Sequence, residues 1–347
     1  MPVASVIDRL RTCVLGLIVL AASTPAGAAK TDVIVLNNGD RFTGEVKQLT
    51  RGQLKVATDD AGTIYIEWDK VVAVTTSLEY DVVVTTGGHL SGRLAPRSST
   101  ALNLVAANGS TMVLPFLDIV SVAPLKAGFL ERIDGTLDAG GSYTKSSGVG
   151  QLNVDLDAGY RRPSYEVFTD ALSNLTRQSG APAVTQYTVQ SGVHRYCDNG
   201  DILTPFVYLA RNIDLGLSFG TAAGFTGGRY LQRTNRSEAL VALGAAAGRE
   251  QLIDGRVLND VDGVVSVAAS SFRHDYPRTA LDLSLLVFPE LNRWGRVRSD
   301  ARAKVKRELF GDFITTITAY DTFDSEPQVA GVRRNDAGVS LSIGWTF

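Results

Sequence analysis

The residues best placed to do chemistry form a charged row late in the chain. From position 296 to position 306 every second residue carries a charge, and the residues between them are small or apolar. Because alternate side chains of a strand point to opposite faces, this segment would present one dense and mainly cationic face. Such a face can bind or guide a charged solute, or it can form ion pairs with acidic strands. The row consists of Arg296, Arg298, Asp300, Arg302, Lys304 and Lys306.

An acidic complement occurs in two earlier segments. The runs 132–145 and 148–161 alternate in the same way, and both carry aspartates on their polar face. Opposite charges on facing strands predict a polarised lumen that conducts or binds a small charged solute, or else an internal ion-pair network that fills a narrow interior. The sequence leaves both interpretations open. The aspartates are Asp134 and Asp138 in the first run, and Asp155 and Asp157 in the second.

The elements that must position these charges are twelve long runs separated by turn residues. They exceed the roughly five or six residues of soluble strands and cover the about 9 to 11 that a tilted membrane strand needs. A lipid-facing arginine at mid-bilayer costs roughly 2 to 4 kcal/mol, so the charged row must point inward. We therefore predict an all-β chain with a 12-stranded antiparallel transmembrane β-barrel over residues 131–347; the alternative is a soluble sheet with one wet face. The runs are 132–145, 148–161, 164–177, 183–197, 201–212, 216–232, 236–250, 260–275, 278–290, 294–309, 312–326 and 334–347.

The last run and the loop lengths predict a location. The chain closes on Trp345-Thr-Phe347, with aromatic residues on the apolar face of the run. This looks like the terminal signature that the barrel-assembly machinery of the outer membrane reads, so we expect that machinery and outer-membrane lipid as partners. Connections such as 161–163 are short, whereas 326–335 is long, and short connections of outer-membrane barrels face the periplasm.

Residues 1–29 read as a signal peptide. Two arginines precede a short apolar run that opens at Cys13, and the small residues around Ala28 suit a signal peptidase. The apolar run is only about ten residues, which is too short to span a bilayer as a helix. Cleavage would leave Cys197 as the single cysteine, so no intramolecular disulfide is expected. We predict a Gram-negative outer-membrane protein whose N-terminal domain lies in the periplasm.

Residues 32–122 contain an internal repeat. At a shift of 48 residues, Gly39 falls on Gly87 and Gly44 falls on Gly92, and apolar β-rich runs align around them. We predict two small bent β-barrels, 30–79 and 80–126. The pattern of strand, glycine turn and bent strand resembles the Sm-like and bacterial SH3-like folds.

Composition limits what this repeat can bind. The 347 residues include 34 Lys and Arg against 36 Asp and Glu, a formal net charge of −2. There is no global basic field to attract nucleic acid. We expect no nucleic acid partner, and instead contact with a periplasmic protein or the cell wall through residues 32–122.

Residues 131–347 resemble the salt-induced outer-membrane protein family, also called domain of unknown function number 481. The resemblance rests on Arg211 to Leu217, on the stretch Gly224 to Glu250, on the basic strand Arg296 to Lys306, and on Asn335-Asp336 with the terminal Trp345-Thr-Phe347. It implies an outer-membrane barrel with no established activity, linked to envelope or salt stress.

Three alternatives remain open. An outer-membrane phospholipase would need a base for its serine, and the barrel offers only His194 and His274, in neighbourhoods unlike that family's motif. We therefore expect no enzyme and no catalytic residue. A soluble periplasmic binding or scaffold protein and a passive structural barrel are the other two. With two cysteines and three histidines, we expect no metal site and no cofactor.

Overall fold

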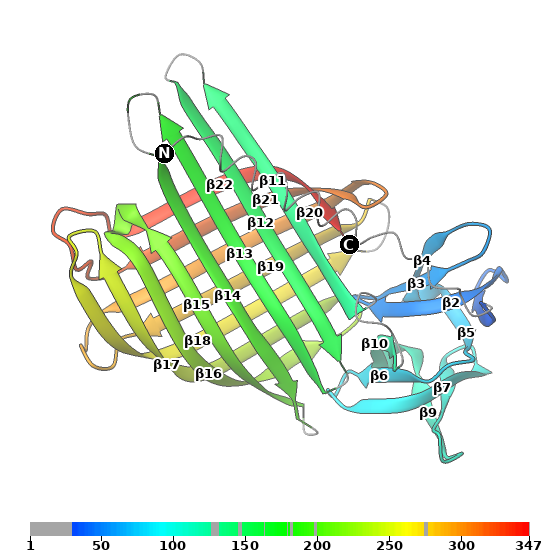
Figure 1. Ribbon diagram of the computed structural model, residues 1–347. Coiled ribbons are helices and arrows are strands. Elements are labelled where there is room, and N and C mark those ends of the chain that lie inside the picture. The colour runs from blue at the N-terminus through cyan, green and yellow to red at the C-terminus, as the bar shows by residue number, and fades with distance from the viewer. Residues whose placement is uncertain are drawn as a thin grey trace, which may run out of the picture.

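The computed structural model describes residues 30–125, 132–144, 148–162, 164–178, 180, 183–197, 200–273 and 277–346. Strands β1 to β10 form an N-terminal domain, and β11 to β22 form a long barrel with that domain at one end (Figure 1). We call the end that carries the domain the near end, and the opposite end the far end. No helix in the described part of the chain is long and apolar enough to cross a membrane. The predicted signal peptide, residues 1–29, lies outside the described residues.

The barrel is a closed ring of twelve antiparallel strands, as predicted. Each strand pairs with the next, and β22 closes the ring by pairing with β11, where Leu137 lies opposite Trp345. The strands are β11 (Ile133–Thr144), β12 (Val149–Arg162), β13 (Tyr165–Gln178), β14 (Val184–Tyr196), β15 (Asp201–Asn212), β16 (Leu217–Arg233), β17 (Ser237–Leu252), β18 (Val257–Arg273), β19 (Thr279–Pro289), β20 (Val297–Phe310), β21 (Phe313–Asp324) and β22 (Asn335–Thr346).

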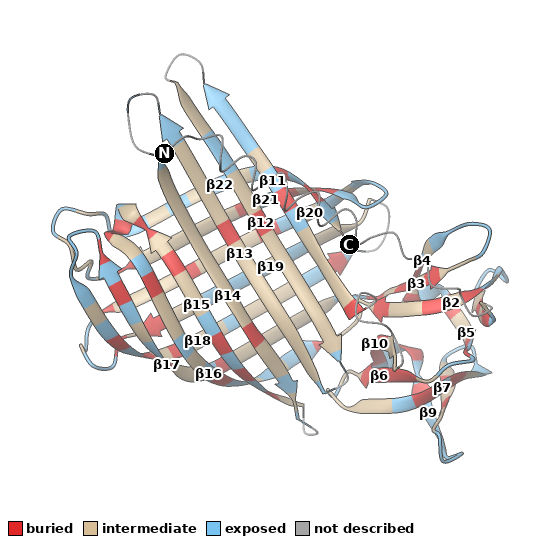
Figure 2. Cartoon of the chain, in the orientation of Figure 1, coloured by how far each residue is buried: buried red, intermediate tan, exposed pale blue. Residues whose placement is uncertain are grey.

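Alternation along each strand gives the barrel two different faces. On β22 the outward residues Leu341, Ile343 and Trp345 are 63%, 60% and 50% exposed, while the inward Ser342 is buried. Figure 2 shows the outer wall mainly in the tan and pale blue of partly and fully exposed residues. The same outward exposure of large apolar side chains recurs on other strands of the ring. Examples are Leu152, Leu203, Phe225, Leu243, Val261, Leu283, Val305 and Ile317.

The N-terminal domain repeats its elements at an interval of 48 residues. Each element of its first half starts 48 residues before a counterpart in its second half, including the 3-10 turns η1 and η2. The first half is β1 (Asp32–Leu36), β2 (Arg41–Thr50), β3 (Gln53–Ala57), β4 (Thr63–Glu67), η1 (Trp68–Lys70) and β5 (Val71–Thr75). The second half is β6 (Tyr80–Val84), β7 (His89–Ser98), β8 (Ala101–Val105), β9 (Thr111–Pro115), η2 (Phe116–Asp118) and β10 (Ile119–Pro124).

The two halves are interlocked. β10 of the second half pairs with β2 of the first, in an open sheet ordered β4-β3-β2-β10-β6-β7-β8-β9. β1 pairs with both β2 and β5, beside this path. After β5, Thr76 exchanges two 2.9 Å hydrogen bonds with Leu94 of β7. The prediction of two separate small barrels is therefore not confirmed, because the strands join in one open sheet.

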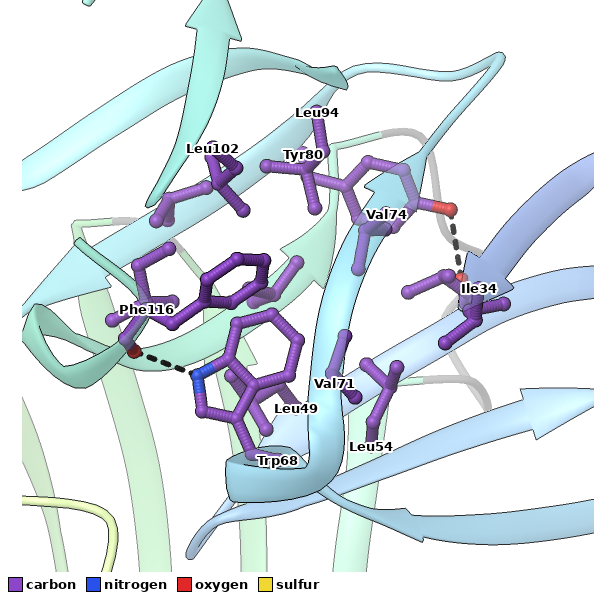
Figure 3. Packing of buried hydrophobic residues seen from close by; sticks show 14 of the residues in the cluster. Ile34, Leu49, Leu54, Trp68, Val71, Val74, Tyr80, Leu94, Leu102 and Phe116 are labelled. Carbon is purple, nitrogen blue, oxygen red and sulfur yellow. Dashed lines mark hydrogen bonds between the residues drawn. The ribbon is translucent and has the colours of Figure 1, made fainter. Parts of the chain in front are cut away.

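Equivalent positions of the two halves meet in one hydrophobic core. Trp68 Nε1 donates to the Phe116 carbonyl at 2.8 Å, and the two rings pack edge to face at 5.2 Å (Figure 3). Tyr80 Oη donates to Asp32 Oδ2 at 3.0 Å. Both pairs are 48 residues apart, so they lie where the two halves contact each other. Apolar side chains from both halves complete this core.

Candidate functional site

The charged row lies inside the barrel, and its near-end half meets the predicted acidic complement. Lys304 Nζ is 2.8 Å from Asp155 Oδ1 and 2.8 Å from Asp157 Oδ1. Lys306 Nζ donates to Asp157 Oδ2 at 2.7 Å. Because alternation on β20 and β12 points these side chains into one lumen, the ion pairs span the barrel interior.

Two predicted aspartates do not pair with the row. Asp138 is 1% exposed and accepts a 2.7 Å hydrogen bond from Thr316 Oγ1. Asp134 lies nearer the near end, and no ion pair within the described residues joins it to the row. Its Oδ1 is buried without a hydrogen bond. The structure thus brings together half of the acidic set that the sequence predicted.

The far-end half of the row binds acids that sequence reasoning missed. Arg296 Nη2 donates to Asp324 Oδ2 at 2.6 Å, and its Nη1 donates to Glu250 Oε2 at 2.9 Å. Arg298 pairs with Glu250 and donates to Asp262 Oδ2 at 2.5 Å. These acids stand at the far ends of β17, β18 and β21 and point inward by the same alternation, which is the signal that could have found them.

One boundary in the row differs from the prediction. The expected run 294–309 placed Arg296 inside the strand, but β20 begins at Val297. The Glu290 amide donates to the Arg296 carbonyl at 2.9 Å, which closes the turn between β19 and β20. Arg296 therefore serves the far-end rim, and the inward row on the strand itself starts at Arg298.

Two side-chain bridges cross the middle of the lumen. Tyr208 of β15 donates a short hydrogen bond to Asp300 of β20, and Arg302 of β20 donates to Thr188 Oγ1 of β14. In the ring of twelve, β14 and β20 are six strands apart and so lie directly opposite each other. Thr322 Oγ1 also donates to Asp300 at 2.9 Å. These bridges divide the interior into a far half and a near half.

The far half is the more filled of the two. A cavity of about 100 Å³ lies beyond the bridges, and Asn212 Nδ2 donates to Asp336 Oδ2 at 2.9 Å across it. The loop between β21 and β22 lies over this end. Its Gln328 carbonyl accepts from Arg256, and its Arg333 amide donates to the Asp214 carbonyl at 3.2 Å.

The near half contains a chamber of about 740 Å³ between the bridges and the N-terminal domain. Its floor is formed by residues of the charged row. Its roof is formed by the strands β2 and β3 of the domain. Small polar and apolar residues of β18 and β19, including Ser266 and Ser284, line one wall. The roof residues are Gln48, Thr50, Arg51, Gln53 and Lys55.

The domain is held on the near end by polar and aromatic contacts. Arg278 donates to Glu308 Oε1 at 2.7 Å and to Gln53 Oε1 at 2.8 Å, and its guanidinium lies 4.8 Å from the centre of the Tyr65 ring. Burial, and next the Asp312 carboxylate, raise the pKa of Tyr65 above its ordinary value of 10.0. The neutral ring accepts the cation on its face.

A second set of contacts holds the domain at two further near-end connections, between β16 and β17 and between β14 and β15. Asn235 Nδ2 donates to the Ile119 carbonyl at 2.8 Å, and Arg236 pairs with Asp69 at 3.0 Å. The glycines Gly87 and Gly200 approach so closely that a Cβ on Gly87 would lie 2.8 Å from the Gly200 Cα. The domain is therefore in direct contact with the barrel rim and lies over part of the chamber.

Of the remaining predicted positions, His194 and Trp345 lie within the described residues. His194 Nδ1 lies 2.8 Å from Thr204 Oγ1, and its ring stacks on Phe168 at 4.4 Å. Its described partners thus include no serine that it could activate. Trp345 lies on the outer face, whereas Phe347 and His274 lie outside the described residues.

Comparison with known proteins gives a distant structural likeness. No protein-family model matches the chain, and no curated protein matches it. Solved structures that are similar to it include the NanC porin in its rhombohedral crystal form, with a TM-score of 0.39 and 11% sequence identity over 62% of this chain and 98% of that chain.

Proposed function

We propose that this chain is an outer-membrane β-barrel that holds small charged solutes in a capped internal chamber rather than an open pore. The observation that carries the proposal is the closed lumen: side-chain bridges cross it at mid-height, and the N-terminal domain covers the near end. A freely conducting channel needs a continuous water-filled path. The bridges interrupt that path at mid-height, and the domain narrows its near end.

The outer wall supports the membrane location. A soluble protein rarely exposes an apolar patch larger than a few hundred Å². Here large apolar side chains such as Leu243, Ile317 and Leu341 are exposed on most strands of the ring. The ring closes through the pairing of Thr136–Ala139 in β11 with β22, and a closed barrel is one of the two structures that can span a bilayer.

The orientation and partners are part of the same proposal. The connections at the near end are short, so we place the N-terminal domain in the periplasm. Contact of residues 32–122 with a periplasmic protein or the cell wall stays a prediction. So do the signal peptide, the Sm-like resemblance, the relation to the salt-induced outer-membrane family and the link to envelope or salt stress.

The closed lumen is tested by conductance in a planar bilayer. We expect the refolded full-length chain to give no stable steps. The double variant Tyr208→Ala, Arg302→Ala removes both bridges and should give discrete steps. Its matched control is Tyr143→Ala, Arg307→Ala, which changes the same residue types at exposed positions.

Heat-modifiable migration on unboiled gels shows that each variant has a folded barrel. Steady conductance of the unmodified chain, equal to that of the double variant, would refute the closed lumen. Silence of all three folded proteins would favour the passive structural barrel.

A further inference from the structure

The outer wall of the barrel carries a set of arginines at its near end. On five of the described strands that run towards this end, an exposed arginine lies within the last five residues of the strand and points outward by alternation. A cation at the edge of an apolar wall either pairs with a neighbouring acid or is available to an anionic ligand. The arginines are Arg162, Arg195, Arg229, Arg273 and Arg307.

Arg162 and Arg195 lie on either side of one tyrosine. Arg162 of β12 is in register with Tyr165 of β13, which is in register with Arg195 of β14, and the three strands lie side by side in Figure 1. Two strand spacings of about 4.8 Å place the two arginine Cα atoms about 10 Å apart. The three side chains face outward, because the next residues along two of the strands, Arg161 and Glu166, form an ion pair inside the barrel.

Neither of these arginines has an acidic partner within the described residues. The Arg195 side chain makes no ion pair or hydrogen bond in this part of the chain. The Nε atom of Arg162 donates to Tyr160 Oη at 2.8 Å, which leaves the Nη groups of this guanidinium without a described partner. The outward acid of the neighbouring strand β15, Asp201, is already bound to Arg229 at 2.7 Å. An anion held between Arg162 and Arg195 would therefore stabilise both charges.

The other three arginines are less suited to such a ligand. Arg229 already has an acidic partner. Arg273 and Arg307 are both in register with Thr279, which repeats the arrangement on β18 to β20. There, however, the Thr279 hydroxyl donates to the Pro277 carbonyl at 3.2 Å, and Arg273 also lines the chamber. The row across β12, β13 and β14 is therefore the best equipped for an anion.

The apolar wall begins directly inside this row. Two residues further along each strand, towards the middle of the barrel, stand Tyr160, Val167 and Val193, again in register with one another. The next outward hydroxyls, those of Thr169 and Ser191, lie 2.9 Å apart and hydrogen-bond each other. These hydroxyls are thus satisfied without water. A ligand that fits this surface has an anionic group at the arginines and apolar chains along β13.

These features specify an anionic phospholipid. A guanidinium binds a phosphate through parallel N–H···O bonds, and arginines at the edge of a bilayer extend to the level of the headgroups. A zwitterionic headgroup would bring its ammonium towards two arginines. A soluble anion would make no use of the apolar wall.

We propose that Arg162 and Arg195 bind the phosphate of an anionic phospholipid in the leaflet next to the near end, with its acyl chains along the outer face of β13. The hydroxyl of Tyr165, which stands between the two arginines, supplies a further donor. The proposal rests on the membrane location given under the proposed function, and it adds a lipid site to the outer wall.

Quenching by brominated lipids tests the site locally. A reporter tryptophan is introduced by Val167→Trp in a full-length chain that also carries Trp294→Phe and Trp345→Phe. The remaining Trp68 is 2% exposed in the core of the domain, out of reach of lipid chains. The chain is refolded in phosphatidylcholine vesicles with increasing fractions of dibrominated phosphatidylglycerol or dibrominated phosphatidylcholine. We expect phosphatidylglycerol to bind at the reporter about fivefold more tightly or better, the factor that one basic residue contributes near anionic lipid.

Variants assign the preference to the two arginines. Arg162→Gln combined with Arg195→Gln should abolish it. Arg162→Lys combined with Arg195→Lys keeps both charges but loses the planar forks, so it should retain part of the preference and keeps the test valid if the neutral pair folds poorly. The matched control is Arg177→Gln combined with Arg249→Gln. It removes two exposed outer-face arginines at the far ends of β13 and β17 and should change nothing.

Three results would overturn the lipid site. They are equal binding of the two lipids at the reporter of a folded chain, a preference that the double glutamine variant keeps, and displacement of the brominated phosphatidylglycerol by soluble glycerol phosphate. Failure of the membrane location looks different, because neither brominated lipid would then quench the reporter. Failure of the closed lumen appears only in conductance, which does not depend on this site.

Discussion

Single charged residues inside this barrel depend on their partners. Arg296 is 4% exposed and lies within 3.5 Å of carboxylate oxygens of Glu250, Glu290 and Asp324. Removing one member of a buried ionic group costs roughly 3 to 5 kcal/mol, because it leaves the other charges uncompensated. The far-end acids would repel one another once the guanidinium is gone.

We predict that Arg296→Met destabilises the barrel by about 3 to 5 kcal/mol. Methionine keeps similar length without the charge. Urea unfolding in lipid vesicles measures the difference, and Arg249→Met on the exposed face of β17 is the control. A loss no larger than that of the control would show that the Arg296 cluster contributes little to stability.

Tyr80 should make the stability of the N-terminal domain depend on pH. Its hydroxyl is fully buried and donates to Asp32 Oδ2 and to the Val46 carbonyl. Burial, and then the Asp32 carboxylate, raise the pKa of Tyr80 above its ordinary value of 10.0. Below pH 10 the neutral phenol stabilises the fold fully. Above pH 10 the Tyr80 phenol ionises only in the unfolded chain. The free energy of unfolding therefore falls as the pH rises towards the raised pKa.

We therefore expect Tyr80 to contribute a loss of about 1.4 kcal/mol for each pH unit above 10, and Tyr80→Phe to remove that contribution. Fluorescence of the buried Trp68, in a chain with Trp294→Phe and Trp345→Phe, follows unfolding of the domain alone. The same slope with and without the Tyr80 hydroxyl would contradict the assignment.

Sequence reasoning placed the charged row correctly in the lumen but did not find all its partners. Alternation shows which residues of a strand share a face. The cost of placing arginine in lipid indicates that the charged face points inward. The position of each side chain along the barrel axis depends on strand tilt and stagger, which a local sequence pattern does not reveal. Hence Asp157 meets the row while Asp138 meets Thr316.

Strands were easier to predict than their pairing. The predicted barrel runs differ from the observed strands by at most three residues at either end. The repeat interval of 48 was also visible in the sequence. Pairing between the halves was not, because nothing in the sequences of β10 and β2 indicates that Val122 pairs with Leu49, and either half could have closed on itself. The pairing between the halves depends on the shared hydrophobic core, which forms only in the folded domain.

The turn at Gly200 is the element that brings the barrel rim against the domain. Its φ of +80° suits glycine, and a Cβ there would lie 2.7 Å from the Thr86 backbone oxygen. The Thr86 backbone cannot move aside as easily as a flexible side chain can. Alanine at this position should therefore push the domain away from the rim and open the chamber.

We predict that Gly200→Ala speeds modification of a cysteine placed in the chamber by Ser266→Cys, in a Cys197→Ser background, with a membrane-impermeant thiol reagent. Gly180→Ala is the matched control, since that turn has the same φ of +80° with nothing within 4 Å of a Cβ. An equal rise in both variants would attribute the effect to turn strain instead of to the domain contact.

The whole molecule combines two bodies that are stabilised in different ways. The domain buries a shared apolar core, whereas the barrel combines a closed ring of strand pairs with buried ion pairs and a small apolar cluster around Phe206 and Phe288. Their contact at the near end is polar, and it is centred on Arg278. We therefore expect two separate unfolding transitions, coupled through this contact.

Arg278→Ala tests that coupling. The guanidinium is partly exposed, so we expect the domain to lose about 1 to 3 kcal/mol from the hydrogen bond to Gln53 and the contact with Tyr65. For a domain of this size the loss lowers the unfolding midpoint by roughly 5 to 15 °C. Calorimetry should show the domain transition shifted, and the barrel transition shifted only by the loss of the Arg278–Glu308 pair, with Arg307→Ala leaving both in place. A single transition that moves as a whole would mean that the domain and barrel unfold as one body, and the cap could then not open without unfolding the barrel.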